Sequence, residues 1–351
     1  MSPGASLTRL RIRIFLGREI RVGKVRFLFQ AICRGNMIEN ATFEVGEGGI
    51  RLDAALLMRF PSVPRAFARE ACESGMVKVN GRSAPKGMKL RGGERIDILR
   101  LDEVQDNHPL PDKAVRVRCI FEDGDLLAFD KMAGMPVHPL TRRETGTLMN
   151  GVVHRWPQCI GVGDSPLMAG ALHRIDSGTS GLVLVAKNTA AFDNVRSQFA
   201  AKTVKKTYLA LVEGAVAVGG TLENDLVHMP GLGYCKMVDI RKGRLSESER
   251  RALSEKALHA VTSYAPIGIT REGNEERTLL EVVIYTGVTH QIRAQLAIAG
   301  MHIVNDRLYG AFAVENMQGH CLHALSASFR HPVSGLPCEI RTKYPGWWTE
   351  S

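Results

Sequence analysis

Two apolar runs separated by one amphipathic segment constrain the fold of this chain more than any other sequence feature. Residues 182–186 (LVLVA) are continuously apolar and rich in β-branched side chains, which is typical of a buried strand. Residues 190–201 place Phe192 and Val195 on one side of a predicted helix. Residues 204–214 (VKKTYLALVEG) then alternate as a strand does. The sequence therefore predicts a sheet with helices packed against it.

Length and composition limit the class of protein. The chain has 351 residues, of which 44% are hydrophobic, so two folded domains are expected and general disorder is excluded. No apolar run approaches the ~18–20 residues of a membrane helix. The seven cysteines include no CxxC pair, which favours a reducing compartment over a disulfide scaffold or a structural zinc site. We expect a cytoplasmic monomer without a membrane segment.

The charge is strongly basic and unevenly distributed. The net charge of +10 is typical of a protein that binds a polyanion, most often a nucleic acid. Residues 1–38 hold eight Lys or Arg and one acid, residues 50–100 hold eleven and five, and residues 101–112 hold four acids. These steps predict four segments: a basic N-terminal extension (1–48), a small module (49–100), a Pro-containing linker (101–114) and one large domain (115–351).

The N-terminal extension has three interpretations. It is an RNA-binding arm, an Arg-rich organelle-targeting segment, or an upstream addition with the working start at Met37. It contains no continuous apolar stretch of the kind found in secretory signals. We favour the start at Met37, because it leaves a short lead-in before Arg51.

The small module has a recognisable order of elements. Residues 52–60 have helical spacing and end at a proline, and residues 65–74 predict a second helix that stops at a glycine. Residues 76–81 (MVKVNG) predict a strand with an Asn-Gly turn, and residues 91–99 (RGGERIDIL) a further strand.

This module resembles the RNA-binding module of ribosomal small-subunit protein four. The resemblance lies in RLDAALL, the helix with Arg65 and Arg69, VKVNGR and GGERIDI. It implies that five basic side chains lie near RNA phosphates: Arg65, Arg69, Lys78, Lys86 and Lys89. The same charges would suit a merely solvated surface, but their clustering within one small fold favours RNA binding.

Three segments of the large domain contain candidate functional residues: 129–139 (FDKMAGMPVHP), 171–187 (ALHRIDSGTSGLVLVAK) and 285–310 (YTGVTHQIRAQLAIAGMHIVNDRLYG). In the second segment, Asp176 lies in a turn-rich loop just before the buried strand, flanked by His173, Arg174 and Thr179. A carboxylate there serves as a nucleophile, a general base, a metal ligand or a turn former. For Asp176 taken alone, turn formation is the favoured role.

The third segment favours a catalytic role for that aspartate. Thr289 is a suitable N-cap for a helix over residues 290–299. His290 and Arg293 are three residues apart and share a face of this helix. An arginine on that face pairs well with a carboxylate and fixes its orientation.

Tyr208 and a charged segment have two interpretations each. Tyr208 lies in the predicted strand over 204–214, either as a core aromatic or as a flat surface for a base with a phenol for proton transfer. Residues 241–256 begin with a capping box of Ser246 and Glu249, which predicts a helix. A solvated helix is favoured there over one that docks RNA.

Several long motifs of the large domain resemble the RluA-type pseudouridine synthase family. They are HRIDSGTSGLVLVAK, KKTYLALVEG, GVTHQIRAQLAIAGMHIVNDRLYG and LHALSASFRHPVSG. Together with the small module, the resemblance covers roughly residues 50–345. It implies an α+β fold: a small α/β RNA-binding module, then a catalytic domain with a large mixed, mostly antiparallel sheet flanked by helices.

The resemblance also implies residue roles. Asp176 falls on the catalytic aspartate, Arg174 on an arginine that contacts RNA around the flipped nucleotide, and Tyr208 on the tyrosine beneath the uracil. Arg293 falls on the arginine that forms a salt bridge to the aspartate. His173, Thr179 and His290 are expected near the substrate.

The implied reaction is the isomerisation of uridine to pseudouridine within RNA. It needs no cofactor or metal, and the cluster of His320, Cys321 and His323 lacks a second ligand group with zinc-site spacing. The carboxylate either attacks the anomeric carbon or assists an elimination.

Ribosomal RNA is the expected substrate and tRNA the alternative. The rival hypothesis is a non-catalytic RNA-binding or ribosome-assembly factor, against which the presence of Asp176 argues.

Four positions depart from the family pattern. Val288 replaces an arginine, Met132 a common proline, and Gln295 and Asn305 stand where His and Gly are frequent. None of these positions is Asp176, Tyr208 or Arg293, so we expect an active enzyme.

Overall fold

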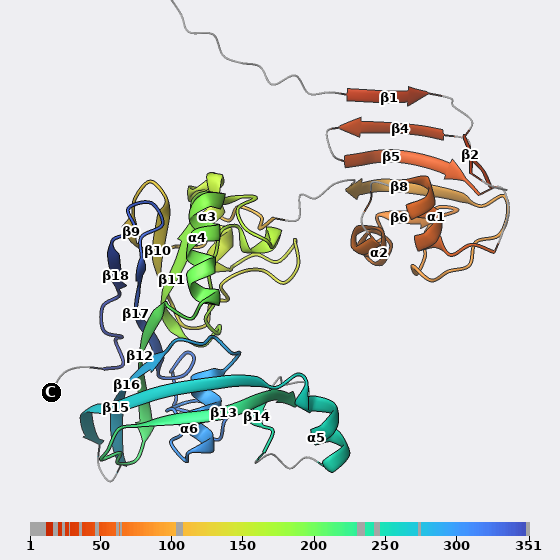
Figure 1. Ribbon diagram of the computed structural model, residues 1–351. Coiled ribbons are helices and arrows are strands. Elements are labelled where there is room, and N and C mark those ends of the chain that lie inside the picture. Colours follow the sequence, from red (N-terminus) through yellow and green to blue (C-terminus); the bar gives the residue numbers. More distant parts are fainter. Residues whose placement is uncertain are drawn as a thin grey trace, which may run out of the picture. The chain divides into compact units, whose positions relative to one another are not determined.

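The structure is a computed structural model that describes residues 12–16, 20–22, 25–27, 29–34, 37–45, 49–60, 63, 65–102, 108–229, 236–241, 246–272 and 275–348. The chain divides into two compact units between Asp106 and Asn107, within the expected linker (Figure 1). No helix in the described ranges is long and apolar enough to cross a membrane. The two units are described separately.

The N-terminal unit is a sheet with two helices on one face (Figure 1). Its strand order is β1 (Ile12–Leu16), β4 (Phe29–Arg34), β5 (Met37–Glu44), β8 (Arg95–Asp102), β6 (Val77–Val79) and β7 (Arg82–Ser83). The helices are α1 (Leu52–Arg59) and α2 (Arg65–Glu73), and a separate hairpin joins β2 (Ile20–Val22) to β3 (Val25–Phe27). Both predicted helices are therefore present, and β6 and β7 flank the predicted Asn-Gly turn.

Strand β5 is an integral part of this unit although it lies in the segment expected to be an extension. It pairs with β8, and its residues Ile38, Ala41 and Phe43 are buried in the core together with Leu52 of α1. Asn40 has a positive φ of 50°, and the buried positions change phase around it. That phase change interrupts the alternation by which a strand is predicted. The packed unit thus begins before the expected boundary at residue 49.

The C-terminal unit is built on one large mixed sheet. Its strand order is β14-β13-β15-β16-β12-β17-β11-β10-β9, with β18 beside β17. The strands are β9 (Cys119–Glu122), β10 (Leu126–Lys131), β11 (Ser180–Ala186), β12 (Lys205–Glu213), β13 (Gly220–Met229), β14 (Lys236–Asp239), β15 (Leu258–Glu272), β16 (Glu275–Ile284), β17 (Leu322–Arg330) and β18 (Pro337–Arg341). Among the described pairings, β11 with β17 is parallel and the others of this sheet are antiparallel. The predicted mixed, mostly antiparallel sheet is confirmed.

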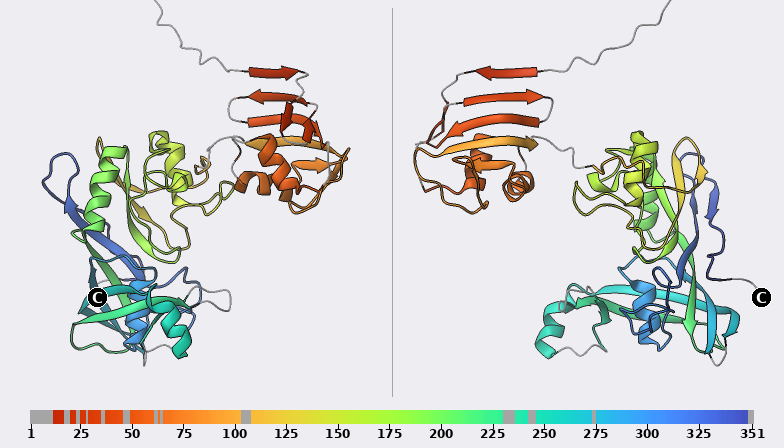
Figure 2. Two further views of the ribbon diagram at one scale, coloured as in Figure 1. Left: turned by 45° about the vertical axis from the view of Figure 1, so that its right-hand side comes forward. Right: turned by 180° about the vertical axis from the view of Figure 1, so that it is seen from behind.

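Helices flank this sheet at two places. They are α3 (Leu148–Arg155), α4 (Thr189–Ala200), α5 (Glu247–Ser254) and α6 (Gln291–Ile298), with short 3-10 turns at Pro157–Cys159 and Pro166–Met168. Helix α4 packs on β11 and β17, whereas α6 packs on β13, β14 and β15 (Figure 2). The loop before β11 and the start of α6 meet between these two places and form the candidate site.

The start of α6 differs from the prediction in its capping residue. His290, not Thr289, is the N-cap; it has a left-handed backbone (φ 54°, ψ 19°) and makes no side-chain capping hydrogen bond. The Thr289 hydroxyl instead accepts a hydrogen bond from Arg174. The left-handed turn explains the difference, because it directs the His290 ring toward Asp176 rather than along the helix.

Candidate active site

Asp176 lies in a tight turn whose backbone is fixed from two directions. The Thr179 amide donates to the Asp176 carbonyl at 3.0 Å, which closes the turn immediately before β11. The buried Thr179 hydroxyl is hydrogen-bonded to His320 Nε2 at 2.8 Å. A side chain at Gly178 would place its Cβ 2.9 Å from the His320 ring. Glycine is therefore required for the close packing of this turn against the segment that carries His320.

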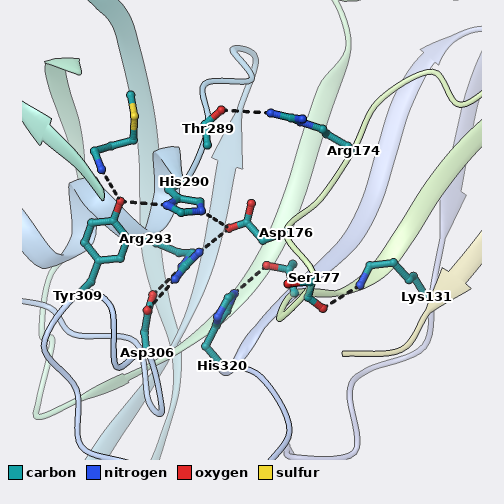
Figure 3. Close-up of polar contacts among 12 residues, drawn as sticks. Lys131, Arg174, Asp176, Ser177, Thr289, His290, Arg293, Asp306, Tyr309 and His320 are labelled. Atoms are coloured by element: carbon teal, nitrogen blue, oxygen red, sulfur yellow. Dashed lines mark hydrogen bonds and ion pairs between the residues drawn. The ribbon is translucent and has the colours of Figure 1, made fainter. Parts of the chain in front are cut away.

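Lys131 holds the turn from the other side, as Figure 3 shows. Its buried Nζ donates to the carbonyls of Met132 at 2.9 Å, Met135 at 2.7 Å and Ser177 at 3.1 Å. Burial lowers the pKa of Lys131 to about 7, although the charge of Asp176 acts in the opposite direction. All three ammonium donors are thus used on backbone, and one of them fixes the residue next to Asp176.

The carboxylate of Asp176 is bound through one oxygen. Arg293 on α6 donates from its NH1 group to Asp176 Oδ2 at 2.7 Å, and His290 Nε2 lies 3.7 Å from the same oxygen. Within the described ranges no hydrogen bond reaches Oδ1, and the Asp176 side chain is 26% exposed. One face of the carboxylate therefore remains accessible to a substrate.

Arg293 is itself fixed by a second carboxylate. Its Nε donates to Asp306 Oδ2 at 2.7 Å and its NH2 group to Oδ1 at 2.8 Å, a bidentate geometry (Figure 3). The Asp306 side chain is 2% exposed. Burial favours the neutral acid, but the hydrogen bonds and charge of Arg293 hold the pKa of Asp306 below its ordinary value. The pKa of Arg293 is raised despite its burial, because it faces both carboxylates.

His290 joins this cluster to Tyr309. The Tyr309 hydroxyl accepts a hydrogen bond from the Met237 amide at 2.9 Å and lies 3.2 Å from His290 Nδ1. Burial lowers the pKa of His290, and burial also raises the pKa of Tyr309 to about 12. Near neutral pH the imidazole is therefore uncharged and the phenol keeps its proton, and the two groups share one hydrogen bond.

Tyr208 lies in β12, where it pairs with Val282 of β16 and Ala324 of β17. Its side chain is mostly buried. Burial raises the pKa of Tyr208, and the negative charge of Asp176 raises it further. The phenol therefore stays protonated at neutral pH, which suits a hydrogen-bond or proton donor rather than a base.

Arg174 and Thr289 lie near Asp176. The exposed Arg174 guanidinium donates to the Thr289 hydroxyl at 3.5 Å (Figure 3). This long contact joins the turn before β11 to the residue that precedes the α6 cap. Arg174 thus carries an accessible charge at the mouth of the site.

Two residues expected near the substrate have internal partners instead. His173 Nε2 accepts a hydrogen bond from the Leu184 amide at 3.1 Å, and burial lowers its pKa to about 3. The buried Thr179 hydroxyl is engaged by His320. Both polar groups therefore support the turn through internal hydrogen bonds, and their contact with a substrate stays a prediction.

The five basic residues of the N-terminal unit do not share one face. Arg69 and Lys86 both bind Glu73, at 2.9 and 3.1 Å, beside α2. Lys78 lies in β6 between Val77 and Val79, which are buried under the helices, so its side chain points to the opposite face of the sheet. Arg65, Arg69 and Lys86 therefore lie on or beside α2, whereas the backbone of Lys89 pairs with Arg51 just before α1.

The positions that depart from the family pattern are accommodated within the fold. Gln295 is buried and bonds to Thr262, Asn224 and the carbonyls of Leu222 and Ala260. Asn305 adopts a φ of 64° and binds the carbonyls of Met317 and Gly319. Val288 packs beside the apolar cluster that includes Tyr309.

Sequence reasoning missed Lys131 and Asp306. Lys131 stands at the end of the apolar run of β10, and a charged residue in such a position is a detectable signal of a buried, bonded lysine. Asp306 lies in a loop between α6 and β17 without periodicity, so no local pattern pairs it with Arg293. Within the described ranges, no cluster of three or more His, Cys, Asp or Glu has metal-binding geometry.

Comparison with known proteins identifies both units. Residues 125–298 match the family described as RNA pseudouridylate synthase, and residues 50–96 match the S4 domain. The chain is 33% identical over 310 residues to ribosomal large subunit pseudouridine synthase D of Xanthomonas campestris, which covers 85% of this chain and 86% of that protein. It is 30% identical to an uncharacterized RNA pseudouridine synthase of Aquifex aeolicus, over 81% and 87% of the two chains.

A solved structure supports the fold. Human RNA pseudouridylate synthase domain containing 1 superposes with a TM-score of 0.52 at 22% identity, and the match covers 67% of this chain and 86% of the human one. At this identity the likeness concerns the fold alone. The large sheet and its flanking helices are therefore shared with that protein.

Proposed function

This chain belongs to the RluA-type family of RNA pseudouridine synthases, and from that premise we propose that it isomerises uridine to pseudouridine in ribosomal RNA with Asp176 as the reacting carboxylate. One observation carries the assignment to Asp176. Arg293 binds Oδ2 of this carboxylate and leaves the other oxygen accessible. A substrate sugar therefore has a fixed, charged oxygen to approach.

The reaction rearranges one nucleotide and exchanges nothing with a second substrate. The bond from N1 to C1′ breaks, the uracil turns in place, and its C5 bonds to C1′. The C5 proton leaves and a proton returns to N1. The changes at C1′ and C5 cancel, so the nucleotide undergoes no net oxidation or reduction and the chemistry requires no redox cofactor.

Asp176 contributes in one of two ways. Its free oxygen attacks C1′, as the nucleophile of a retaining glycosidase does, or it accepts a proton from the sugar in an elimination. Both routes use a carboxylate of defined orientation. Arg293 supplies that orientation, and Asp306 balances the charge of Arg293 and fixes its plane.

Tyr208 and Arg174 handle the extruded nucleotide. Taking a uridine out of its stack costs a few kcal/mol. Stacking of the uracil on Tyr208 offsets about 1–3 kcal/mol of that cost. The raised pKa of Tyr208 keeps a phenolic proton available for the base. Arg174 at the mouth of the site contacts the RNA backbone beside the flipped position.

Ribosomal RNA is the proposed substrate class. Relatives that share most of the chain are named large-subunit ribosomal pseudouridine synthases. The S4 domain supplies basic side chains on the α2 side, where RNA phosphates would bind. In this proposal the reaction takes place in the C-terminal unit, and the N-terminal S4 domain contributes to the binding of ribosomal RNA.

The test maps pseudouridine in RNA from cells that contain the wild-type protein, Asp176→Asn, the control Asp193→Asn, or none. Asp193 is an exposed carboxylate on α4. We expect the same ribosomal site to be lost with Asp176→Asn and with no protein, and kept with Asp193→Asn. Loss of a tRNA site instead would overturn the ribosomal assignment. An unchanged map with impaired ribosome assembly would overturn the catalytic function.

A further inference from the structure

A cleft of about 590 Å³ lies in the C-terminal unit next to the turn that carries Asp176, but separate from the catalytic residues. Three stretches of the chain form most of its lining: residues 116–118 before β9, residues 130–135 at the end of β10, and residues 343–347 after β18. Its volume falls in the range of sites that hold one small ligand or one nucleotide.

Flat and apolar side chains line the cleft. Tyr344 is 42% exposed and Met132 is 60% exposed, an unusual degree for such residues. Trp347 and Met135 are partly buried and add further apolar surface. Exposed aromatic rings with accessible faces stack on nucleobases regardless of sequence.

Positive charge surrounds these rings. Arg116, Arg118 and Lys343 are all exposed at the cleft. The single carboxylate in the lining, Asp130, is bound by Arg118 at 3.1 Å. In the described part of this unit, the side chains of Arg116 and Lys343 form no ion pair. The cleft therefore offers two uncompensated cations next to stacking surfaces, a combination that matches a phosphate joined to a base.

We propose that this cleft binds an unpaired nucleotide of the substrate RNA, with its base on Tyr344 and Trp347 and its phosphates at Arg116 and Lys343. The nucleotide is a second contact of the same RNA whose uridine is modified at Asp176. The proposal thus rests on the proposed function and deepens it.

Hydrogen bonds connect the cleft to the catalytic turn. Lys131 lines the cleft and donates to the Ser177 carbonyl at 3.1 Å. Ser180 Oγ is hydrogen-bonded to His323 Nδ1 at 2.8 Å, and His323 Nε2 to Thr342 Oγ1 at 2.8 Å, the residue before Lys343. The two walls of the cleft are therefore tied to both ends of the turn that holds Asp176. A nucleotide bound there stabilises that turn.

The test uses photo-crosslinking of the full chain to a single-stranded oligoribonucleotide that contains 5-iodouridine, with peptide mapping by mass spectrometry. We expect a crosslink to the peptide with Tyr344 and Trp347. The Tyr344→Ala variant should lose the crosslink at residue 344 and weaken binding of the oligonucleotide about fivefold or more, as expected for one lost stacking contact. A crosslink confined to the Tyr208 peptide would overturn the proposal.

A charge-matched pair of variants tests the phosphate contacts. Arg116→Ala with Lys343→Ala should reduce the salt dependence of binding by about 0.7 per lost contact. The control, Arg251→Ala with Lys256→Ala, removes two exposed charges on and just after α5. Helix α5 follows the edge strand β14, and the cleft lies at the other edge of the sheet, beside β9 and β10 (Figures 1 and 2). Equal salt slopes for both double variants would overturn the proposal. So would competition by poly-glutamate but not by RNA, which would indicate an acidic protein partner.

Crosslinking and pseudouridine formation, measured in both the wild-type and the Asp176→Asn protein, distinguish failure of this proposal from failure of the proposed function. If the wild-type chain modifies no RNA but the cleft crosslink persists in both proteins, the nucleotide contact stands and the reaction fails. If pseudouridine forms and no crosslink maps to residues 343–347, the reaction stands and the cleft proposal fails.

Discussion

Asp176 is the outermost of three charged groups in a row. Asp306 is deeply buried, Arg293 lies between, and Asp176 is partly exposed, with contacts of 2.7–2.8 Å throughout. The inner pair neutralises itself, so the remaining negative charge is located at the residue that faces solvent. Such an arrangement delivers an oriented carboxylate without a buried net charge. Asp306 is accordingly a positioning residue.

Asp306→Asn tests this role. The amide keeps the shape of the side chain but loses the charge and one acceptor, so Arg293 is held less firmly. We expect kcat for pseudouridine formation to fall roughly 10²-fold with KM for RNA nearly unchanged, because small displacements of reacting groups are costly. Single-turnover assays measure the chemical step directly.

Asp239→Asn is the matched control for this substitution. Asp239 is also buried, binds Asn224 and the Arg241 amide at 2.8 Å each, and does not contact the Arg293 cluster. Its variant should lose stability but keep kcat. An equal loss of kcat in both variants would show that Asp306 acts through overall stability alone.

At the scale of elements, the site depends on the packing of two loops. Gly319 has a φ of 75°, and a Cβ there would lie 2.2 Å from the Gly178 carbonyl oxygen. This contact aligns the segment of His320 with the turn of Asp176. Ala at this position must therefore displace one of the two backbones.

Gly319→Ala should abolish most activity and destabilise the C-terminal unit by more than the ~1 kcal/mol that a left-handed glycine typically contributes. Gly146→Ala is the control, because Gly146 has a similar φ of 81° but no atom within 4 Å of its Cβ position. That variant should lose only the conformational contribution and keep its activity. Urea unfolding measures the stability of both variants, and pseudouridine assays measure their activity. Equal losses of stability and activity in the two variants would contradict the packing argument.

The elements also indicate what the sequence can predict. A continuous apolar run correctly indicated β11, and residue spacing indicated α4, β12 and α6. Helix α4 buries one stripe of side chains, whereas β11 and β12 are buried on both faces. Periodicity missed β5, where the buried positions change phase at Asn40, and it misplaced the α6 cap because a left-handed His290 has no sequence signature. The pairing of Asp176 with Arg293 followed from chemistry and from family resemblance. Their link to Asp306 is purely tertiary, because Asp306 lies in an irregular loop without a local pattern.

At the scale of the molecule, buried histidines couple the stability of the C-terminal unit to pH. Burial lowers the pKa of His173 to about 3 and those of His320 and His323 to about 4. In the unfolded chain a histidine titrates near ~6.5. Below that pH the unfolded state binds protons that the folded state does not, so stability falls as pH decreases toward 4.

The free energy of unfolding should fall by up to about 1.4 kcal/mol per pH unit for each of these histidines between pH 6 and 4.5. Urea titrations at several pH values measure this slope. His323→Gln should lower it by about a third, whereas His154→Gln, at an exposed position on α3, should leave it unchanged. A slope independent of His323 would contradict the assignment of its burial.

The proposed function places the chemistry in the C-terminal unit and part of the RNA binding in the N-terminal unit. The two faces of the N-terminal sheet provide a matched control for that part of the binding. Arg65 is exposed on α2, whereas Lys78 projects from the opposite face of the sheet. If RNA phosphates bind the α2 side, Arg65→Ala should raise the Kd by a similar factor for RNAs of any sequence. The slope of log affinity against log salt concentration should fall by about one. The kcat at saturating RNA should not change, because Arg65 belongs to the other unit. Lys78→Ala should change neither the Kd for RNA nor the salt slope. A loss of affinity equal to that of Arg65→Ala would contradict binding of the RNA on the α2 side alone.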